Sequence, residues 1–588
     1  MSINSAASIT LSGMLATQVQ LSVTSANISN ADTVGYTEKT ANQVSVNNGG
    51  AGAGTAITSI DGSVNAFLLK SLVGAISDLG AANIKNNYLD QLQTLYGSTE
   101  GSGDAGTSLG NTLASFESAI STLANTPNSA SLQSNVVGAL DDVASQLRDT
   151  SSGIQTLRGN ADQNIATSIG DLNKQLQLIG SLNVQIEQAT AAGQPTGDLT
   201  DQRNTALQSV ASDLPVSYFT TSNGSLQVYT TSGQALVDNS VHTVSYTPAA
   251  SVTASTVYSS TPPSGFGGIM VNGVDITSQI GSGSIGTLVN LRDTVLPGAQ
   301  SQLDELASQL ETTLNAVHNQ GTAVPAPAAL TGTATVTAAT ALSGSGTVRI
   351  GVVDQNSDLV SYQDLDLANY ATVGDLVGAI NGISGLSASI DANGHVAIAT
   401  TGANTGIAIN EMSSAAGSAG QGLSDWLGLN DLLTGSGASD IAVRSDILQN
   451  SGLLATATLD SSASPAIGSQ VLSAGSATVI NDLYDALIGK TTFGAVAGIG
   501  TTTASFADYA ADIVSNVATQ ASNASTDYTN KQTTQTSFQN TLSSESGVNL
   551  DQETARLSTL QNQYSAAAEL LQVINQMFTS LITAMQSA

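Results

Sequence analysis

The sequence of 588 residues contains no cysteine, which excludes disulfide bonds, thiolate catalysis and cysteine-ligated metal sites. Basic residues are also scarce: 13 Lys and Arg stand against 44 Asp and Glu, and the formal net charge is -31. A nucleic acid partner needs a basic surface that releases the counterions of its phosphates. We therefore expect no nucleic acid partner, and we interpret the charge as a source of solubility and of repulsion between copies before assembly.

Aromatic residues make up only 4% of the chain, although 41% of it is hydrophobic, so we expect aliphatic cores. At roughly 100 to 200 residues per domain, the length suggests three to five domains. Runs of about 18 apolar residues are missing, which predicts no membrane insertion. The first basic residue is Lys39, so the start of the chain lacks the positive segment of a cleavable signal peptide. If the protein is exported, we expect a route without such a signal.

Charge is missing from both ends of the chain. Residues 1–31 contain no Asp, Glu, Lys or Arg, and after Arg556 the chain carries only Glu569. Both ends have helical periodicity, and a helix exposed to solvent normally carries charge on its polar face. We interpret the two ends as surfaces that become buried against another subunit. The alternative is that they form the core of a helical bundle within one chain.

Apolar residues define a face on each terminal helix. A helix over residues 3–29 would be about 40 Å long, and its apolar face comprises Ala7, Leu11, Met14, Leu21 and Ile28. The C-terminal end has an a/d heptad pattern over about five heptads, interrupted only by Glu553. This seam comprises Leu550, Leu557, Leu560, Tyr564, Ala567, Leu571, Ile574, Phe578 and Leu581.

The interior alternates between helical and β patterns. It predicts an α+β multidomain fold with a terminal α-helical coiled coil, an elongated helical-bundle domain and β-rich outer domains. The predicted segments are 1–55, an N-terminal axial helix and turn that pairs with 540–588; 56–215, a helical domain completed by 445–539; 216–290, a β-rich domain; 291–324, a long helix returning to the helical domain; 325–444, an inserted β-rich domain; and 540–588, the C-terminal coiled-coil helix.

Short motifs at both ends resemble those of a known family. Asn27-Ile28-Ser29-Asn30 is followed by Gly35-Tyr36-Thr37, and the C-terminal helix is preceded by Ser546-Gly547-Val548-Asn549. This pair of motifs, in this order, resembles the ends of bacterial flagellar axial proteins of the rod, hook and hook-associated type. Interior segments narrow the resemblance to the hook-associated type: Asp198-Leu199 with Asp201-Gln202-Arg203, Leu291-Arg292-Asp293, Asn315-Ala316-Val317-His318, and Leu427-Gly428-Leu429-Asn430-Asp431.

The resemblance implies a structural junction protein that polymerises at the distal end of the flagellar hook and connects hook and filament. Its implied partners are further copies of itself in a tubular assembly, the hook protein, the next hook-associated junction protein and a cytoplasmic export chaperone. The implied location is the extracellular flagellum, reached by the flagellar type III export route. The alternatives are a hook or distal-rod axial subunit, and a secreted surface adhesin or enzyme built on an axial-protein frame.

The end of the first helix supplies further candidate assembly residues, namely Asn27, Asn30, Gly35 and Tyr36. Glycine permits the positive φ that a sharp turn needs at Gly35, and Tyr36 either contacts another subunit or only marks the helix stop. Glu38 departs from the family pattern, which usually has Arg there. Because burial of a seam residue contributes roughly 1.5 to 3 kcal/mol and ordering a backbone residue costs roughly 1 to 2 kcal/mol, we expect the ends to become ordered only on assembly.

The sequence predicts no enzyme, no cofactor and no metal site. The histidines at 242, 318 and 395 are far apart, and we interpret His318 as a cation at a helix C-terminus. Glycines at 281, 283 and 286 match a dinucleotide fingerprint in letters only, because a βαβ pattern is missing. Two acidic pairs have the residue types of glycosidase carboxylates, but we interpret them as solvated charge: Asp141 with Asp142, and Asp364 with Asp366.

Overall fold

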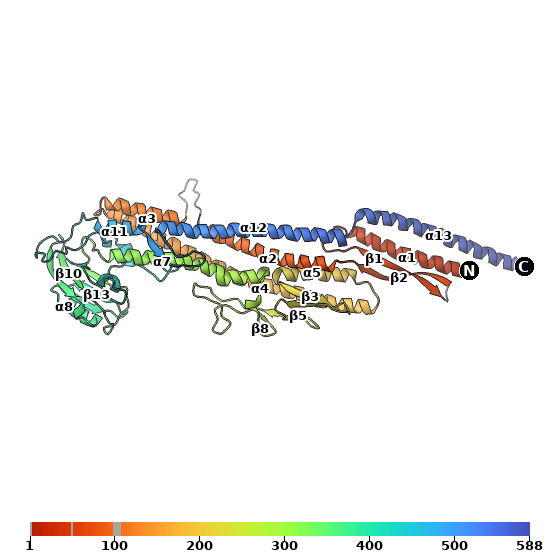
Figure 1. The fold of residues 1–588 in the computed structure, drawn as a ribbon, viewed down its shortest axis with the longest axis horizontal. Helices are drawn as coiled ribbons and strands as arrows, with labels where there is room; N and C mark the ends of the chain where they lie inside the picture. The colour runs from red at the N-terminus through yellow and green to blue at the C-terminus, as the bar shows by residue number, and fades with distance from the viewer. Residues whose placement is uncertain (1–2, 49–50, 98–107, 588) are drawn as a thin grey trace.

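A computed structural model describes residues 3–48, 51–97 and 108–587, so small parts of the predicted segments 1–55, 56–215 and 540–588 lie outside the described residues. The molecule is elongated, and its parts follow one another along the long axis (Figure 1). A stalk that carries both chain termini lies at one end, a helical body follows, and a β-rich outer domain lies at the other end. This arrangement confirms the predicted α+β multidomain fold.

The stalk consists of the two terminal helices and a β-hairpin. Its elements are α1 (Ile3–Ser29), α13 (Leu550–Ser587), β1 (Lys39–Asn48) and β2 (Ala51–Gly62). α1 and α13 pack side by side and run in opposite directions, since the two termini lie together at the tip (Figure 1). The antiparallel hairpin lies along α1 and contains two register shifts. The sequence analysis did not predict this hairpin.

The body is built around α4, whose 62 residues span about 90 Å at 1.5 Å per residue. Its buried side chains recur at helical spacing and form one continuous core with the neighbouring helices. Asn65, Ser108 and Ser505 cap three of these helices by accepting N–H bonds of the first turn. The body helices are α2 (Ala66–Leu95), α3 (Leu109–Ala124), α4 (Ala130–Ala191), α5 (Gly197–Asp213), α6 (Gly283–Asn290), the π-helical η2 (Leu291–Val295), α7 (Leu296–His318), α10 (Ser445–Gln449), η4 (Ser451–Leu453), α11 (Thr478–Ile488) and α12 (Phe506–Ser546).

Two small antiparallel sheets pack against the body along α4. Their elements are β3 (Val216–Thr220), β4 (Leu226–Thr230), β5 (Ala235–Val237), β6 (Val244–Ser245), β7 (Met270–Val271), β8 (Val274–Asp275) and η1 (Thr277–Gln279). Val228 and Val271 lie in the same core as the leucines of α4. The predicted β-rich segment 216–290 therefore shares the core of the body. A further hairpin, β17 (Thr491–Phe493) with β18 (Thr502–Ala504), precedes α12.

The outer domain has a core of its own, which extends from Leu330 to Leu429. Its elements are β9 (Ala329–Thr331), β10 (Thr347–Asp354), β11 (Leu359–Asp366), η3 (Leu367–Asn369), α8 (Val373–Asn381), β12 (Leu386–Ile390), β13 (Val396–Thr400), β14 (Thr405–Asn410) and α9 (Leu423–Leu427). Its two three-stranded sheets have the strand orders β11-β10-β14 and β12-β13-β9.

The limits of the outer domain differ from the predicted segment 325–444. β15 (Leu433–Thr434) and β16 (Ala442–Val443) already belong to the core of the body. The returning chain, in contrast, contributes Leu459, Val471 and Leu472 to a small cluster against the β10-β11-β14 sheet. The boundary is not a single point, because the chain crosses between the two cores more than once.

α2 is the one helix among the described residues that is long and apolar enough to cross a membrane. Leu72, Leu89 and Leu92 of this helix are buried in the core of the body. A core helix passes the same test of length and composition, and the packing of α2 against α5, α6 and α12 accounts for its apolar sequence.

Candidate functional site at the joint of stalk and body

The stalk joins the body through a group of polar residues, all buried except the half-buried Tyr36, that we call the joint cluster. It comprises Asn27, Tyr36, Thr37, Lys39, Asp201 and Glu553. These residues come from α1, the turn after it, β1, α5 and α13. Segments that are far apart in the sequence therefore meet where the stalk joins the body.

The turn after α1 requires glycine at position 35. The amide of Tyr36 donates to the Thr33 carbonyl at 3.1 Å, and Gly35 has a φ of +82°. A Cβ atom on Gly35 would lie 2.7 Å from Oγ1 of Thr205 in α5. Positive φ and close approach to α5 both favour glycine, so the residue lets the turn dock on the body.

Asn27 holds four segments together through one side-chain amide. Its Nδ2 donates to the Lys39 carbonyl at 2.9 Å and to Glu553 Oε2 at 3.2 Å. Its Oδ1 accepts from the Lys39 amide and from the Tyr36 hydroxyl, both at 3.0 Å. The side chain is fully buried, and a buried polar group is tolerated when its hydrogen bonds are satisfied. Asn27 thus fixes the register of α1 against β1 and α13.

Asp201 receives the turn on the side of the body. Its carboxylate accepts from the Thr37 amide and from the Thr37 hydroxyl, both at 2.9 Å. It also pairs with Lys39, whose Nζ donates to the Thr37 carbonyl at 3.1 Å and lies 4.6 Å from the centre of the Tyr36 ring. Lys39 and Asp201 are both buried. Two motifs that the sequence analysis recognised separately, Gly35-Tyr36-Thr37 and Asp201-Gln202-Arg203, therefore form one contact.

Arg203 of the same motif faces the opposite way, into the body. Its Nη1 donates to Asn183 Oδ1 at 3.0 Å and to the Gly224 carbonyl at 2.6 Å. Asn183 in turn accepts from the Leu226 amide at 2.9 Å. The first residue of the motif thus binds the stalk turn, and the third binds α4 and the start of β4.

Electrostatics at the joint keep the tyrosine protonated. Burial, together with the negative charges of Asp198, Asp201 and Glu553, raises the pKa of Tyr36 to about 12, so its hydroxyl remains a donor to Asn27. Burial raises the pKa of Glu38, and the neighbouring Glu553 raises it further, whereas Arg556 lowers it. Glu38, which departs from the family pattern, is therefore close enough to Glu553 and Arg556 of α13 for both charges to affect its pKa.

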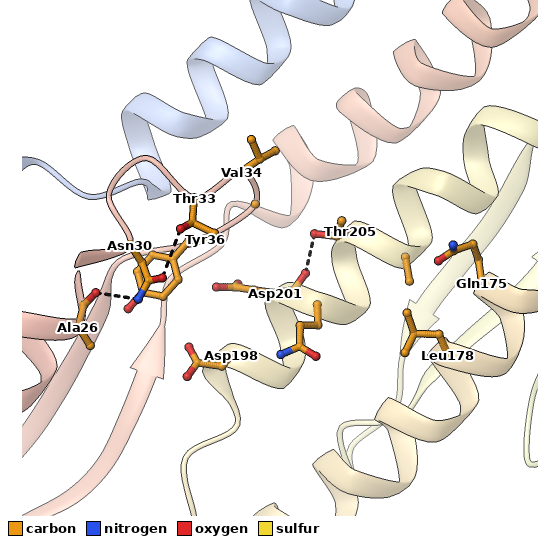
Figure 2. Close-up of a pocket in the computed structure, with 13 residues that line it drawn as sticks. Ala26, Asn30, Thr33, Val34, Tyr36, Gln175, Leu178, Asp198, Asp201 and Thr205 are labelled. Atoms are coloured by element: carbon orange, nitrogen blue, oxygen red, sulfur yellow. Dashed lines mark hydrogen bonds between the residues drawn. The ribbon is translucent and has the colours of Figure 1, made fainter. Parts of the chain in front are cut away.

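A groove of about 530 Å³ lies beside the joint cluster. Figure 2 shows Thr33 and Val34 on one wall, Gln175 and Leu178 of α4 on the opposite wall, and Asp198 and Asp201 of α5 between them. Val34 is 87% exposed and Leu178 is 42% exposed. The groove therefore offers apolar side chains to solvent next to an acidic residue.

The predicted face of α1 is only partly covered within one chain. Ala7, Met14, Leu21 and Ile28 are half-buried, and Leu11 is 44% exposed. The most buried side chains of α1 are instead Thr10, Ala16, Thr17, Thr24 and Asn27. Thr10 and Thr17 donate to the carbonyls of Ala6 and Gly13, so their hydroxyls are satisfied within the helix. Of the other predicted residues, Asn30 and Tyr36 are half-buried and line the groove.

The predicted seam of α13 coincides with its least exposed positions. Leu560 and Ile574 are buried, and Leu557, Tyr564, Ala567, Leu571 and Phe578 are half-buried. Leu550 and Leu581, at the two ends of the seam, are about half exposed. Glu553, which interrupts the heptad pattern, is the seam position that binds Asn27. The roles of the predicted seam residues in assembly stay predictions.

Two further motifs form a second joint, where the end of α7 contacts residues 430–433 at the boundary between the outer domain and the body. Asn315 Nδ2 donates to the Leu433 carbonyl at 2.9 Å, and Asn319 Nδ2 donates to Asp431 at 2.7 Å. His318 is fully buried; its Nδ1 contacts the Asn430 carbonyl at 2.6 Å, and its Nε2 accepts from the Ala455 amide at 2.8 Å. Burial lowers the pKa of His318 to about 4. The prediction of a cationic helix cap was therefore wrong, because burial favours the neutral ring.

Arg292 supplies a third contact between distant segments. Its guanidinium is fully buried, donates to Asp162 of α4 at 3.0 Å and to Asp293 at 2.8 Å, and lies 4.4 Å from the centre of the Phe266 ring. The motif residues of the sequence analysis thus lie where parts of the fold meet.

The alternative chemical sites have structural partners. Asp364 pairs with the buried Arg349 at 2.6 Å, and Asp366 caps η3. Asp141 is 3.9 Å from Arg148. Gly283 begins α6 with a φ of +75° and packs against the backbone of Asp213. Among residues 3–48, 51–97 and 108–587, three or more His, Asp or Glu side chains never gather in a way that could hold a metal ion.

The roles of Lys39 and Glu553 in the joint cluster were not predicted from the sequence. Lys39 was noted only as the first basic residue of the chain, and Glu553 only as a break in the heptad pattern. The hairpin was missed because polar and apolar residues hardly alternate from Thr40 to Asn47, where most side chains are exposed on both faces.

The two ends of the chain match known protein families. The family described as flagella basal body rod protein matches residues 9–37, and the family described as flagellar basal body rod FlgEFG protein C-terminal matches residues 539–584. These matches cover α1 with its turn and α13, which form the stalk. The stalk is therefore similar to the ends of flagellar basal body rod proteins.

The body narrows the class further. The family described as flagellar hook-associated protein FlgK helical domain matches residues 89–329. The body is therefore similar to the helical domain of flagellar hook-associated proteins. It is 22% identical over 599 residues to flagellar hook-associated protein 1 of Escherichia coli K12, an alignment that covers 97% of this chain and 98% of that protein.

Other relatives are matched over shorter stretches. Flagellar hook-associated protein 1 of Salmonella typhimurium LT2 is 24% identical over 321 residues, which cover 53% of this chain and 56% of that protein. The chain thus matches little more than half the length of that relative. Among solved structures, the flagellar hook junction protein FlgK from Burkholderia pseudomallei is similar with a TM-score of 0.49 at 15% identity, over 80% of this chain and 98% of that chain.

Proposed function

We propose that the protein is a structural junction protein of the bacterial flagellum, which polymerises at the distal end of the hook and connects hook and filament. The observation that carries this proposal is a second apolar face on α13. Leu570, Val573 and Met577 are 52%, 50% and 52% exposed, and helical spacing places them on a side of α13 next to the seam that packs on α1. Glu569 is the one charged side chain of α13 after Arg556, and an exposed apolar face with so little charge around it favours burial against another subunit.

α1 supports the same proposal. Leu11 and Leu15 are 44% and 53% exposed, and α1 carries no charged side chain from Ile3 to Ser29. Each copy therefore offers apolar side chains on both stalk helices. Burying a side chain of this size contributes roughly 1.5 to 3 kcal/mol, so many repeated contacts in a tube would stabilise stalks that a single chain leaves half covered.

The proposed partners are further copies of the chain, the hook protein, the next hook-associated junction protein and a cytoplasmic export chaperone. The proposed location is the extracellular flagellum, reached by the type III route without a cleavable signal. The relatives are structural flagellar proteins, and we extend a non-enzymatic role to this chain. A hook or distal-rod subunit is the alternative within the class, and the match of the body to a hook-associated helical domain favours the junction.

The test compares two substitutions at sites of similar exposure. Leu570→Asp changes the second face of α13, and Val360→Asp changes the outer domain, where Val360 is 45% exposed. Neither should unfold the chain, because both side chains already contact water. We expect Leu570→Asp, like deletion of residues 550–588, to abolish attachment of filaments to hooks, whereas Val360→Asp should leave it intact. Normal filament attachment with Leu570→Asp and with the deletion would refute the proposal.

A further inference from the structure

The joint carries a protruding side chain as well as a groove. Phe67, in the first turn of α2, is 76% exposed. Lys70 lies one helical turn further along the same face and is also exposed. Leu69 lines a second cavity with Asn204 of α5 and is buried. Residues two apart on a helix point about 200° apart, so Phe67 faces away from α5, which forms the floor of the groove.

The groove complements this pair of side chains. Val34 and Leu178 offer apolar walls to solvent, and the side chain of Asp198 is 75% exposed at the groove. An aromatic ring followed by a cation thus matches apolar walls beside an anion. Such complementarity aligns and selects partners more than it adds affinity.

The protrusion and the groove lie on different sides of one joint. A contact between them is heterologous, because one copy supplies the protrusion and the next copy supplies the groove. Heterologous contacts repeat around a ring or along a helix rather than closing a pair. This is the geometry that a tubular assembly needs, so the inference rests on the proposed function.

We propose that the groove at the joint is the lateral docking site for Phe67 and Lys70 of a second copy of the chain. The contact adds a second level of packing, outside the stalk helices, at the position where the joint cluster fixes the direction of the stalk. Neighbouring copies are then held both through their stalks and through their joints.

The absence of native cysteine makes a cross-linking test direct. A variant with Phe67→Cys and Leu178→Cys is expressed in the bacterium that carries this chain, and its flagella are isolated and mildly oxidised. We expect a ladder of dimers, trimers and larger species on a nonreducing gel. Each single variant should give no ladder, and neither should Phe67→Cys with Val257→Cys, since Val257 is 62% exposed but lies outside the groove.

A charge exchange provides the second measurement. Lys70→Glu in the double-cysteine variant should reduce the ladder, and adding Asp198→Lys should restore it, provided that thermal melts show an intact body. Incorporated protein that gives no ladder, only cross-linked monomer, or a band with a different protein would overturn the docking site alone. If the wild-type chain is not incorporated into flagella, the proposed function fails, and this inference fails with it.

Discussion

α4 and α13 are both long helices with regular apolar spacing, yet a single chain buries the apolar face of α4 fully and that of α13 only partly. Leu147, Leu172 and Leu176 of α4 are fully buried, with 0% exposure. In the described part of α13, only Glu553, Leu560 and Ile574 are buried. The core of the body is therefore complete in the monomer, whereas the apolar side chains of the stalk are only partly buried.

The buried side chains of α1 also differ in kind from those of the body. Thr10, Thr17 and Thr24 take three of the five buried positions of α1, whereas leucine and isoleucine take most of the fully buried positions of α4. A threonine whose hydroxyl bonds to its own helix can face water or protein at little cost. A helix of this composition gains little from one partner, which fits our expectation that the ends become ordered on assembly.

The weak packing of the stalk makes its attachment to the body depend on the joint cluster. Lys39 and Asp201 form a buried pair with further hydrogen bonds to Thr37. Such pairs contribute little net stability but are costly to break on one side. We interpret the cluster as a device that orients the stalk.

Removal of Asp201 should give the largest effect. Asp201→Ala leaves the buried Lys39 without its carboxylate and Thr37 without an acceptor. We expect the free energy of opening the joint to fall by about 3 to 5 kcal/mol. Hydrogen exchange should accelerate at amides 35–40, while the amides in the middle of α4 remain protected.

Asp198→Asn is the matched control for this substitution. Asp198 lies 3.9 Å from the same Lys39 nitrogen, but its side chain is 75% exposed, and exposed pairs contribute at most about 1 kcal/mol. Equal effects of the two substitutions would show that the buried carboxylate does not hold the joint.

A matched pair of leucine truncations compares the body with the stalk. Leu172 is 0% exposed in α4, and Leu560 is 5% exposed in α13. Leu172→Ala should lower the free energy of unfolding of the body by about 2 to 5 kcal/mol. Leu560→Ala should leave that transition within about 0.5 kcal/mol of wild type and only accelerate exchange within α13.

Denaturant titration of the monomer, followed by circular dichroism and by hydrogen exchange, measures both quantities. A loss of body stability with Leu560→Ala as large as that with Leu172→Ala would mean that stalk and body unfold as one unit. The contrast between a finished body and an unfinished stalk would then be wrong.

The long helices were predictable from the sequence because their apolar residues recur at the spacing of a single helix face. The helix over residues 3–29 and the α13 seam follow directly from apolar spacing. The buried face of α1 was harder to predict, because three of its five buried side chains are threonines and the predicted apolar side chains are only partly buried. The apolar spacing of a helix that takes part in assembly reflects contacts with other subunits as well as contacts within its own chain.

The pairing of motifs could not be predicted in the same way. Tyr36 and Asp201 are far apart in the sequence, and so are His318 and Asn430, and their proximity depends on long helices that double back. The charge state of His318 was predicted wrongly for a related reason. Its position at a helix end was visible, but its burial against the outer domain was not.

The smallest predicted effect is the pH dependence of stability at the second joint, which lies in the fully packed part of the molecule. The pKa of His318 is lowered from its ordinary value of 6.5 to about 4. Between these values the unfolded chain binds a proton and the folded chain does not, so stability rises with pH. Acidification from pH 7 to 5.5 should therefore cost about 1.2 kcal/mol.

His318→Gln removes this titration, so the difference in pH slope between wild type and variant isolates the histidine. It separates His318 from Glu311, whose burial raises its pKa to about 7 with the opposite sign of pH dependence. His395→Gln serves as the control, because His395 is partly exposed. An unchanged slope with His318→Gln would contradict the prediction. A changed slope that disappears when the outer domain is unfolded would place the proton-sensitive step at the second joint, away from the stalk.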